Sequence, residues 1–307
     1  MRFAVLEQQA FTGGGGAASN NALLLTNAAQ QKHLFEADLD QAVHLLHQAL
    51  CANPYYVPAW LALAVVRSDQ GQTGKSAKII DYVHYLTRDI KRWRWDKVLV
   101  AYQLGRTRLL PTELSYIIAE IKGKPRRDAL QLAFTIWPQP RELLDNIGVE
   151  SIIHLFTHAT AHNLPDQARY FWAVIEEQAI EYKREDLLRC IDMLMRNSEI
   201  PAAARIWRTH LSPEQLLYNG DFSAPFMQKA FGWRKALHKS VEQRVESIAA
   251  NSEVQTLHLR FKGWDNISYH HLSQIVPLTG GQHYQLRALV KTDKLTTDQR
   301  PYLEVYG

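Results

Sequence analysis

Three regularly spaced histidines are the first candidates for chemistry. His154, His158 and His162 recur every four residues, which places them along one face of a helix. Two neighbours on such a face could hold a metal ion, but the outer two lie about 12 Å apart along the axis. No cysteine or carboxylate stands at a matching spacing, so packed or surface histidines are the preferred interpretation. We therefore expect no metal site and no cofactor.

A glycine-rich stretch imitates a phosphate-binding loop. Residues 69–76 end in Gly-Lys-Ser, but Asp69 stands where such a loop requires its first glycine. The stretch also joins two predicted helices instead of following a buried strand. Gly71 and Gly74 are therefore expected to serve a turn. Because no serine elbow, HExxH motif or kinase-like set of residues occurs, we predict no catalytic residues and a protein that is not an enzyme.

An aromatic residue in a polar loop is the remaining candidate. Trp264, Asp265, Asn266 and Tyr269 lie on one connection between predicted strands. Aromatic rings bind the C–H faces of sugars, and neighbouring polar groups bind the hydroxyls. These four are the predicted glycan-binding residues. The alternative is a polar loop in which Trp264 packs locally, while Trp233 is expected to be a core residue.

Charge and composition exclude other classes. The chain has 307 residues with a net charge of +4, and its short basic runs at Arg88–Arg94 and Lys124–Arg127 are too small for a phosphate-binding stripe. Nucleic acid is therefore not an expected partner. No apolar run approaches the roughly 18–20 residues of a membrane span. Cys51 and Cys190 lack zinc or disulfide spacing and are expected to be buried apolar residues.

Residues 23–212 show a helical period throughout. Apolar residues recur at three- and four-residue spacing, as in Val43, Leu46 and Leu50. Short breaks with proline or glycine are typical of loops between antiparallel helices. Later hairpins are expected as Trp93–Leu104 with Leu114–Ile121, Ala129–Trp137 with Leu143–His162, and Pro165–Tyr182 with Glu185–Asn197, closed by Ala202–His210.

One part of this region resembles tetratricopeptide repeats, whose unit is about 34 residues long. Pro54 precedes Trp60 by six residues, the spacing between the end of one unit and the start of the next. Arg67 and Gln30 depart from the repeat, since an aromatic and a small residue are usual there. The likeness covers Asp40–Asp81, and its other carriers are Ala42, Ala49, Leu63, Ala64 and Gly71. It implies a helical solenoid that binds protein partners.

The periodicity changes to alternation in residues 213–307. Leu257, Leu259 and Phe261 share one face of a predicted strand, and further strands are expected at Ser273–Leu278, His283–Lys291 and Tyr302–Tyr306. The region resembles carbohydrate-binding modules of the galactose-binding-like jelly-roll type. The motifs that carry the resemblance are Asn219–Phe222, Phe231–Trp233, Leu257–Phe261, Gln274–Leu278, Gly281–Leu286 and Leu295–Thr297. The sandwich is partial, so further chain or the helical array is expected to cover its open side.

The predicted fold class is α+β in two domains. A flexible lead-in (1–22) precedes a tetratricopeptide-like helical solenoid (23–212) and a partial antiparallel jelly-roll β-sandwich (213–307). Together the parts resemble bacterial tetratricopeptide proteins found beside exopolysaccharide synthesis and export genes. That resemblance implies a non-catalytic scaffold in the periplasm or elsewhere outside the cytoplasm, with protein partners and polysaccharide as a second partner.

Two alternatives stay open. One is a cytosolic adaptor that binds a peptide in the solenoid groove, and the other is an accessory region of a glycan-active enzyme. The first six residues, Met1–Leu6, begin like an export signal, but Glu7–Gln9 interrupts the apolar run before it is long enough. The compartment is therefore open at this point.

Overall fold

The structure is a computed structural model that describes residues 21–88, 90–211, 216–248, 255–262, 270, 272–294 and 302–306. The chain divides into two compact units, residues 1–193 and 194–307. Among the described residues, no helix is both long enough and apolar enough to cross a bilayer. The predicted domain boundary after residue 212 stays a prediction, because a division by contacts does not test which part folds alone.

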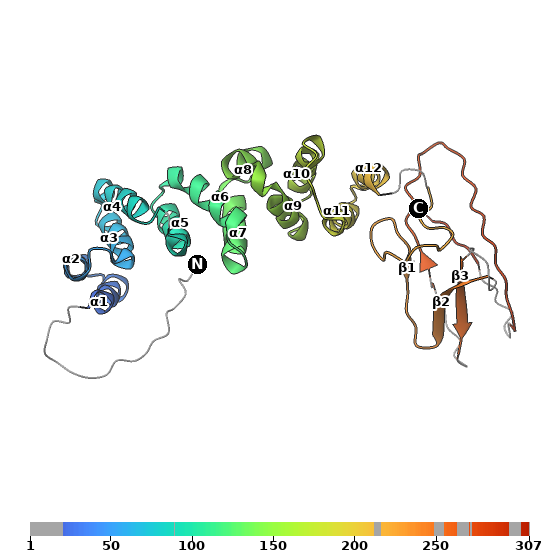
Figure 1. Cartoon of the computed structure of the whole chain (residues 1–307), viewed down its shortest axis with the longest axis horizontal. Coiled ribbons are helices and arrows are strands. Elements are labelled where there is room, and N and C mark those ends of the chain that lie inside the picture. Colours follow the sequence, from blue (N-terminus) through green and yellow to red (C-terminus); the bar gives the residue numbers. More distant parts are fainter. Residues whose placement is uncertain are drawn as a thin grey trace. The chain divides into compact units, whose positions relative to one another are not determined.

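Twelve α-helices form in the described part of the chain, and from α1 to α7 each helix packs against the next (Figure 1). They are α1 (Ala22–Phe35), α2 (Leu39–Ala52), α3 (Val57–Asp69), α4 (Thr73–Leu86), α5 (Arg94–Gln103), α6 (Leu110–Glu120), α7 (Lys124–Ile136), α8 (Pro140–Ile147), α9 (Ile152–Ala161), α10 (Pro165–Glu177), α11 (Arg184–Arg196) and α12 (Ile200–His210), with short 3₁₀ turns at Lys91–Trp93, Thr107–Leu109 and Val149–Ser151.

Local residue choice explains where these helices begin. The Asn21 side chain accepts a hydrogen bond from the Leu23 amide at 2.9 Å, and Asp38 accepts one from the Gln41 amide at 3.0 Å. Such caps satisfy amides that have no partner inside the helix. Helices α3, α6, α7, α8, α10 and α12 instead carry proline in the first turn, where its missing N–H costs nothing.

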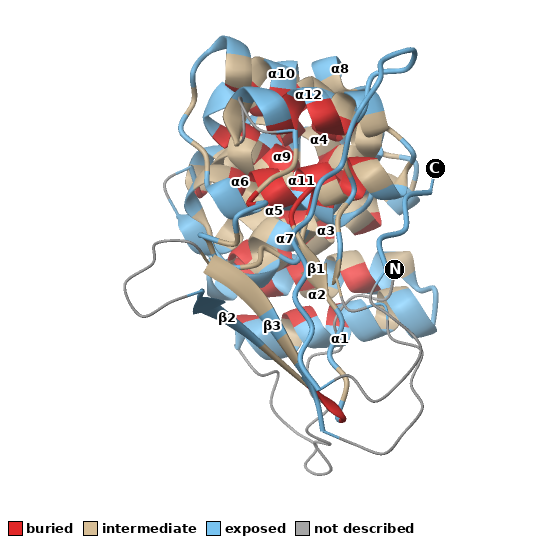
Figure 2. Ribbon diagram, turned by 90° about the vertical axis from the view of Figure 1, so that its right-hand side faces the viewer, coloured by how far each residue is buried: buried red, intermediate tan, exposed pale blue. Residues whose placement is uncertain are grey.

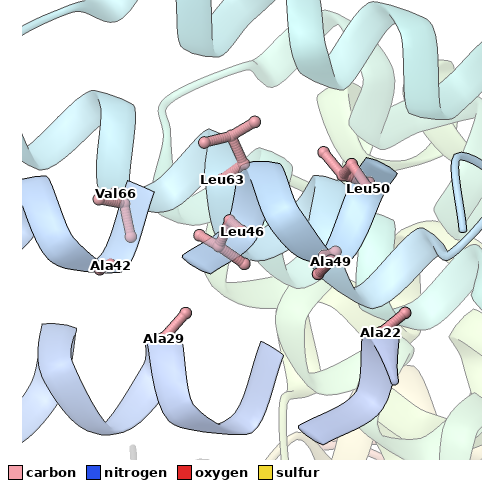
Figure 3. Close-up of a cluster of buried hydrophobic side chains, with 9 residues drawn as sticks. Ala22, Ala29, Ala42, Leu46, Ala49, Leu50, Leu63 and Val66 are labelled. Atoms are coloured by element: carbon pink, nitrogen blue, oxygen red, sulfur yellow. The ribbon is translucent and has the colours of Figure 1, made fainter. Parts of the chain in front are cut away.

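Small residues bring the first helices close together. Ala29 of α1 and Ala42 and Ala49 of α2 are fully buried, and Figure 3 shows them at the contact between the two helices. Leu46 of α2 and Leu63 of α3 belong to the same cluster. Because alanine has only a methyl group, the helix backbones approach where these residues meet. The small residues that carry the repeat likeness are therefore packing residues.

Trp60 joins this cluster to the next one. Its ring packs against the buried residues around Leu46 and also against those around Ala64, Ile80 and Val83. The indole Nε1 donates a hydrogen bond to the Pro54 carbonyl at 2.8 Å. The predicted role of Trp60, which was to fill the gap between two hairpins, is confirmed.

One predicted pair of helices is wrong. Residues 143–162 were expected as one helix, but α8 ends at Ile147 and α9 begins at Ile152. Gly148 between them has a φ of +95°, which ends a helix because side chains rarely adopt it. As a result α9 packs chiefly against α10, and α8 packs against α6 and α10.

The second unit contains α12 and four short strands, β1 (Arg234–Lys235), β2 (Val241–Ser247), β3 (Gln255–Phe261) and β4 (Leu272–Ser273). β2 pairs with β3 and β1 with β4, both antiparallel. Trp207 of α12 packs its ring against Tyr218 at 5.2 Å and Phe231 at 5.8 Å between centroids. This helix is therefore part of the core of the second unit.

A jelly-roll sandwich is not present among the described residues of this unit. β3 confirms the alternation predicted around Leu257, whereas β4 covers only the start of the predicted strand at Ser273–Leu278. Residues 282–291 and 302–306 have no assigned strand, and the strands in Figure 2 carry mostly intermediate and exposed residues. An alternating pattern becomes a strand only where a neighbour accepts its backbone hydrogen bonds. The expected sandwich stays a prediction.

Candidate functional site

The four predicted glycan-binding residues, Trp264, Asp265, Asn266 and Tyr269, lie outside the described residues, so their role stays a prediction. Trp233 is described and is half-buried. Its indole donates a hydrogen bond to the Asn219 carbonyl at 2.9 Å, and its ring lies 5.9 Å from that of Phe222. These contacts make Trp233 part of the packing of the loop that begins this unit.

A shallow pocket of about 230 Å³ lies beside the β2–β3 hairpin. Phe226, Lys235, Gln243, Arg244 and Leu257 contribute to its wall. The Lys235 ammonium lies 5.9 Å from the centre of the Phe226 ring. An aromatic ring beside amide and cationic groups is a combination that suits a polar or anionic ligand.

His154 and His158 of α9 are partly buried, and His162, which caps the end of this helix, is exposed. The ring of His158 lies 4.6 Å from that of Phe134 and 4.1 Å from that of His162. Burial, with a smaller contribution from His162, lowers the pKa of His158 to about 4. Burial also lowers the pKa of His154. Within the described ranges, no three His, Cys, Asp or Glu side chains gather as a metal-binding group.

The loop that imitates a phosphate site is a turn between α3 and α4. Gly71 has a φ of +75° and ends α3. The Ser76 hydroxyl, which would bind a cation in a nucleotide site, is buried and donates to the Ala64 carbonyl at 2.7 Å. Asp69 lies 2.7 Å from His33 of α1. These side chains hold helices together. Gly71 lies in the turn, as predicted, whereas Gly74 lies in the first turn of α4.

Arg67, the departure from the repeat pattern, connects neighbouring helices. Its guanidinium donates to the Gln70 side chain at 2.9 Å and lies 3.4 Å from the His47 ring of α2. Gln70 in turn donates to Asp40 at 2.9 Å. Polar contacts thus replace the aromatic packing that is usual at this position, and they fix α3 against α2.

A buried ion cluster links α5 and α6. Glu113 accepts hydrogen bonds from Arg94 at 2.8 Å and from Lys97 at 2.7 Å. The Glu113 and Lys97 side chains are only 2% and 5% exposed. Arg94 also lies 3.7 Å from the centre of the Tyr116 ring. His84 of α4 also lies 3.1 Å from Glu113. Because the Glu113 carboxylate is the counter-charge of two buried cations, we interpret the cluster as structural.

The two cysteines differ. Cys190 is buried in α11, as expected, and burial raises the pKa of its thiol to about 12. Cys51 is exposed near the end of α2, so the expectation that it is buried is wrong. A helical period places a residue on a face but does not say how far a neighbouring helix covers that face.

Exposed aromatic residues gather where α2 and α4 end and α3 and α5 begin. Tyr55 is 72% exposed and Tyr85 is 78% exposed. Tyr82 lies one turn before Tyr85, and its ring meets that of Trp60 at 4.9 Å. Because successive helices run antiparallel, their ends meet at this side of the first unit.

Basic residues lie at the same place. The Arg92 guanidinium lies 4.8 Å from the centre of the Trp93 ring. Burial raises the pKa of Tyr56, and the positive charge of Arg92 opposes part of this rise. Lys91 and Ile90 precede Arg92 and are exposed. We call this surface, formed by Tyr55, Tyr56, Tyr82, Tyr85, Ile90, Lys91 and Arg92, the aromatic–basic edge.

Sequence reasoning did not find this edge. The basic run at Arg88–Arg94 was visible, but it was weighed only as a phosphate-binding stripe. The tyrosines could not be assigned, because periodicity alone does not show that Tyr55 and Tyr85 stay uncovered. A signal was nevertheless present, because two tyrosines stand on one hairpin connection and a basic run stands on the next connection at the same end of the helices.

No family model matches the chain, and the search of curated proteins gave no match. Three solved structures are similar over 63% of it: pilF of Pseudomonas aeruginosa (15% identity, 77% of that chain, TM-score 0.29), the type IV pilus biogenesis factor PilW (14%, 95%, 0.31) and a tetratricopeptide repeat protein from Parabacteroides merdae (12%, 78%, 0.30). Because these TM-scores are low, the description of a helical repeat array rests on the packing given above.

Proposed function

We propose that this protein is a non-catalytic scaffold whose helical array binds one or more protein partners. The observation that carries the proposal is the aromatic–basic edge. Tyrosine and arginine are enriched at protein interfaces, where they contribute a large share of the binding energy. The ring of Tyr85 is 78% exposed, so it stabilises the folded chain little where it stands.

The test compares how much of its native partners the full chain binds before and after two of these tyrosine rings are removed. The variant carries Tyr55→Ala and Tyr85→Ala, and the partners are captured on the immobilised chain and quantified. We expect capture to fall at least about tenfold, because each truncation removes an interface anchor. The control is Tyr102→Ala, another exposed tyrosine at the end of α5, away from the edge. Equal losses in both variants would contradict the proposal.

The finer proposal places this scaffold in polysaccharide assembly or export, with a glycan bound by the second unit. Its support is the order of motifs in residues 217–307, together with the pocket beside Phe226 and Lys235. Trp264 and its neighbours remain the proposed sugar contacts. A glycan array with the full chain, Trp264→Ala and Phe226→Ala tests this. If neither substitution changes the binding of glycan, neither Trp264 nor Phe226 contacts the sugar.

The compartment is part of the same proposal. A role in polysaccharide export implies a location outside the cytoplasm, whereas the alternative of a cytosolic adaptor implies the reverse. Fractionation of native cells, with detection of the endogenous protein, separates the two. If the protein is found with cytosolic markers, the adaptor alternative replaces the export role while the scaffold proposal stands.

A further inference from the structure

We infer that the aromatic–basic edge binds an acidic polypeptide segment that carries aromatic or aliphatic side chains. This inference rests on the proposed function, because it names the chemistry of the partner that the helical array binds. Three features of the edge carry it, namely its charge, its exposed rings and the arrangement of the two.

Charge is concentrated at this part of the array. Residues 81–110 contain seven lysines and arginines and three aspartates, so this segment alone has the formal excess of +4 of the whole chain. Arg94 and Lys97 are held by Glu113, and Arg106 contacts Asp81 at 3.3 Å. Lys91 and Arg92 make no ion pair within the described part of the chain. Lys91 lies 5.8 Å from the centre of the Tyr116 ring, and Arg92 lies over the Trp93 ring and interacts electrostatically with Asp96. Both residues are nevertheless exposed, so they favour an anionic partner.

One of these cations lies near a tyrosine of the edge. Arg92 lies close enough to act electrostatically on Tyr56, which follows Tyr55 in the chain. Tyr82 contacts Trp60, whose indole is fixed on the Pro54 carbonyl. The tyrosines of the edge thus lie on α4 and on the connection between α2 and α3, and its cations lie on the connection that follows α4. A segment lying along them meets both kinds of group.

This combination favours a polypeptide over an anionic polysaccharide. An acidic polysaccharide supplies charge for Lys91 and Arg92, but it offers no apolar side chain for Ile90, which is 46% exposed. An acidic peptide with a phenylalanine or leucine contacts both the cations and the apolar groups. Binding through the edge therefore requires both parts of the peptide.

The test uses the full chain and four labelled probes in fluorescence anisotropy. Three probes are peptides of about a dozen residues. The first is rich in glutamate and carries two phenylalanines. The second has lysine in place of each glutamate of the first, and the third has alanine in place of each phenylalanine of the first. The fourth probe is an oligogalacturonate of similar length. The variants are Lys91→Glu with Arg92→Glu, and a control with Lys75→Glu and Lys78→Glu. The control makes the same charge change at exposed positions in the first half of α4.

We expect the acidic aromatic peptide to bind most tightly, at least about tenfold above the other probes, and to weaken as salt is added. The edge variant should lose this binding and the control should keep it. Preference for oligogalacturonate, or equal binding to both variants, overturns the inference. Strong binding of the basic peptide overturns it while the scaffold proposal stands. If no peptide binds, the inference fails, and the capture of native partners decides the scaffold proposal separately.

Discussion

At the scale of the residue, Glu113 has the most consequential position in the first unit. It is the only carboxylate that contacts both Arg94 and Lys97 in the described structure, and all three side chains are largely buried. Replacement by glutamine leaves two buried cations without a counter-charge. We expect Glu113→Gln to lower the free energy of unfolding by about 3 kcal/mol, measured by urea denaturation.

Glu120→Gln on the same helix is the matched control, because Glu120 is exposed. Its effect should stay within about 0.5 kcal/mol. Adding Lys97→Met to the Glu113 variant should restore part of the stability, since one unpaired buried charge disappears. Equal effects at positions 113 and 120 would show that the cluster does not stabilise the fold.

His158 predicts how stability depends on pH. Its folded pKa of about 4 lies below the ordinary value of 6.5, so the unfolded chain binds a proton more readily than the folded chain. The contribution is fully present above pH 6.5 and is lost as the pH falls from 6.5 towards 4. We expect His158→Phe, which keeps a ring against Phe134, to flatten this part of the curve.

The measurement is denaturation followed by circular dichroism at several pH values in that window. His44→Phe on α2, an exposed histidine, is the control. If both variants flatten the curve to the same degree, the pH dependence does not arise from burial of His158.

The role of a single residue could be predicted from the sequence only where packing requires one type of side chain. Trp60 and the alanines of α2 were correctly assigned, because a gap between helices requires a large ring and a close contact requires a methyl group. The contact of Arg67 with His47 could not be foreseen, since His47 reaches it only after α2 and α3 have packed. The same holds for Glu113, whose partners belong to another helix.

At the scale of the element, the contact of α1 with α2 depends on small residues. Ala29 is fully buried there, while Ala28, its neighbour in α1, is exposed. We expect Ala29→Leu to cost about 1–3 kcal/mol in stability, because the larger side chain forces the helices apart. Ala28→Leu should cost less than about 0.5 kcal/mol. Thermal unfolding of both variants is the measurement, and a larger loss for Ala28→Leu would contradict this packing.

Elements were predictable where the period is long and uninterrupted. The break at Gly148 was missed because the apolar period continues across it from Leu143 to Phe156. In the second unit, by contrast, the sequence predicted strands that the described structure does not contain. The alternation at 283–291 is as regular as that of β3, yet only β3 has a neighbour, β2, within the described residues. A pattern states which face is apolar and not which strand is adjacent.

At the scale of the whole molecule, the place of α12 can be tested. Trp207 packs on Tyr218 and Phe231, and Arg208 donates to the Pro277 carbonyl. We expect a fragment of residues 194–307 to unfold cooperatively, whereas residues 213–307 alone should not, because they lack the helix that covers Phe231. Near-ultraviolet circular dichroism during heating distinguishes the two. Cooperative unfolding of the shorter fragment would instead support the boundary predicted from the sequence.

The neighbour-to-neighbour packing of the first unit also determines how it opens. α1 contacts α2 and α3, and α6 contacts α5, α7 and α8, so within the described residues α1 has fewer helical neighbours than α6. In such arrays each segment is stabilised by the segments on both sides. Amide hydrogens of α1 should therefore exchange with solvent sooner than those of α6. The array would lose order gradually from its end, and the buried ion cluster would lie in its slowest-exchanging part.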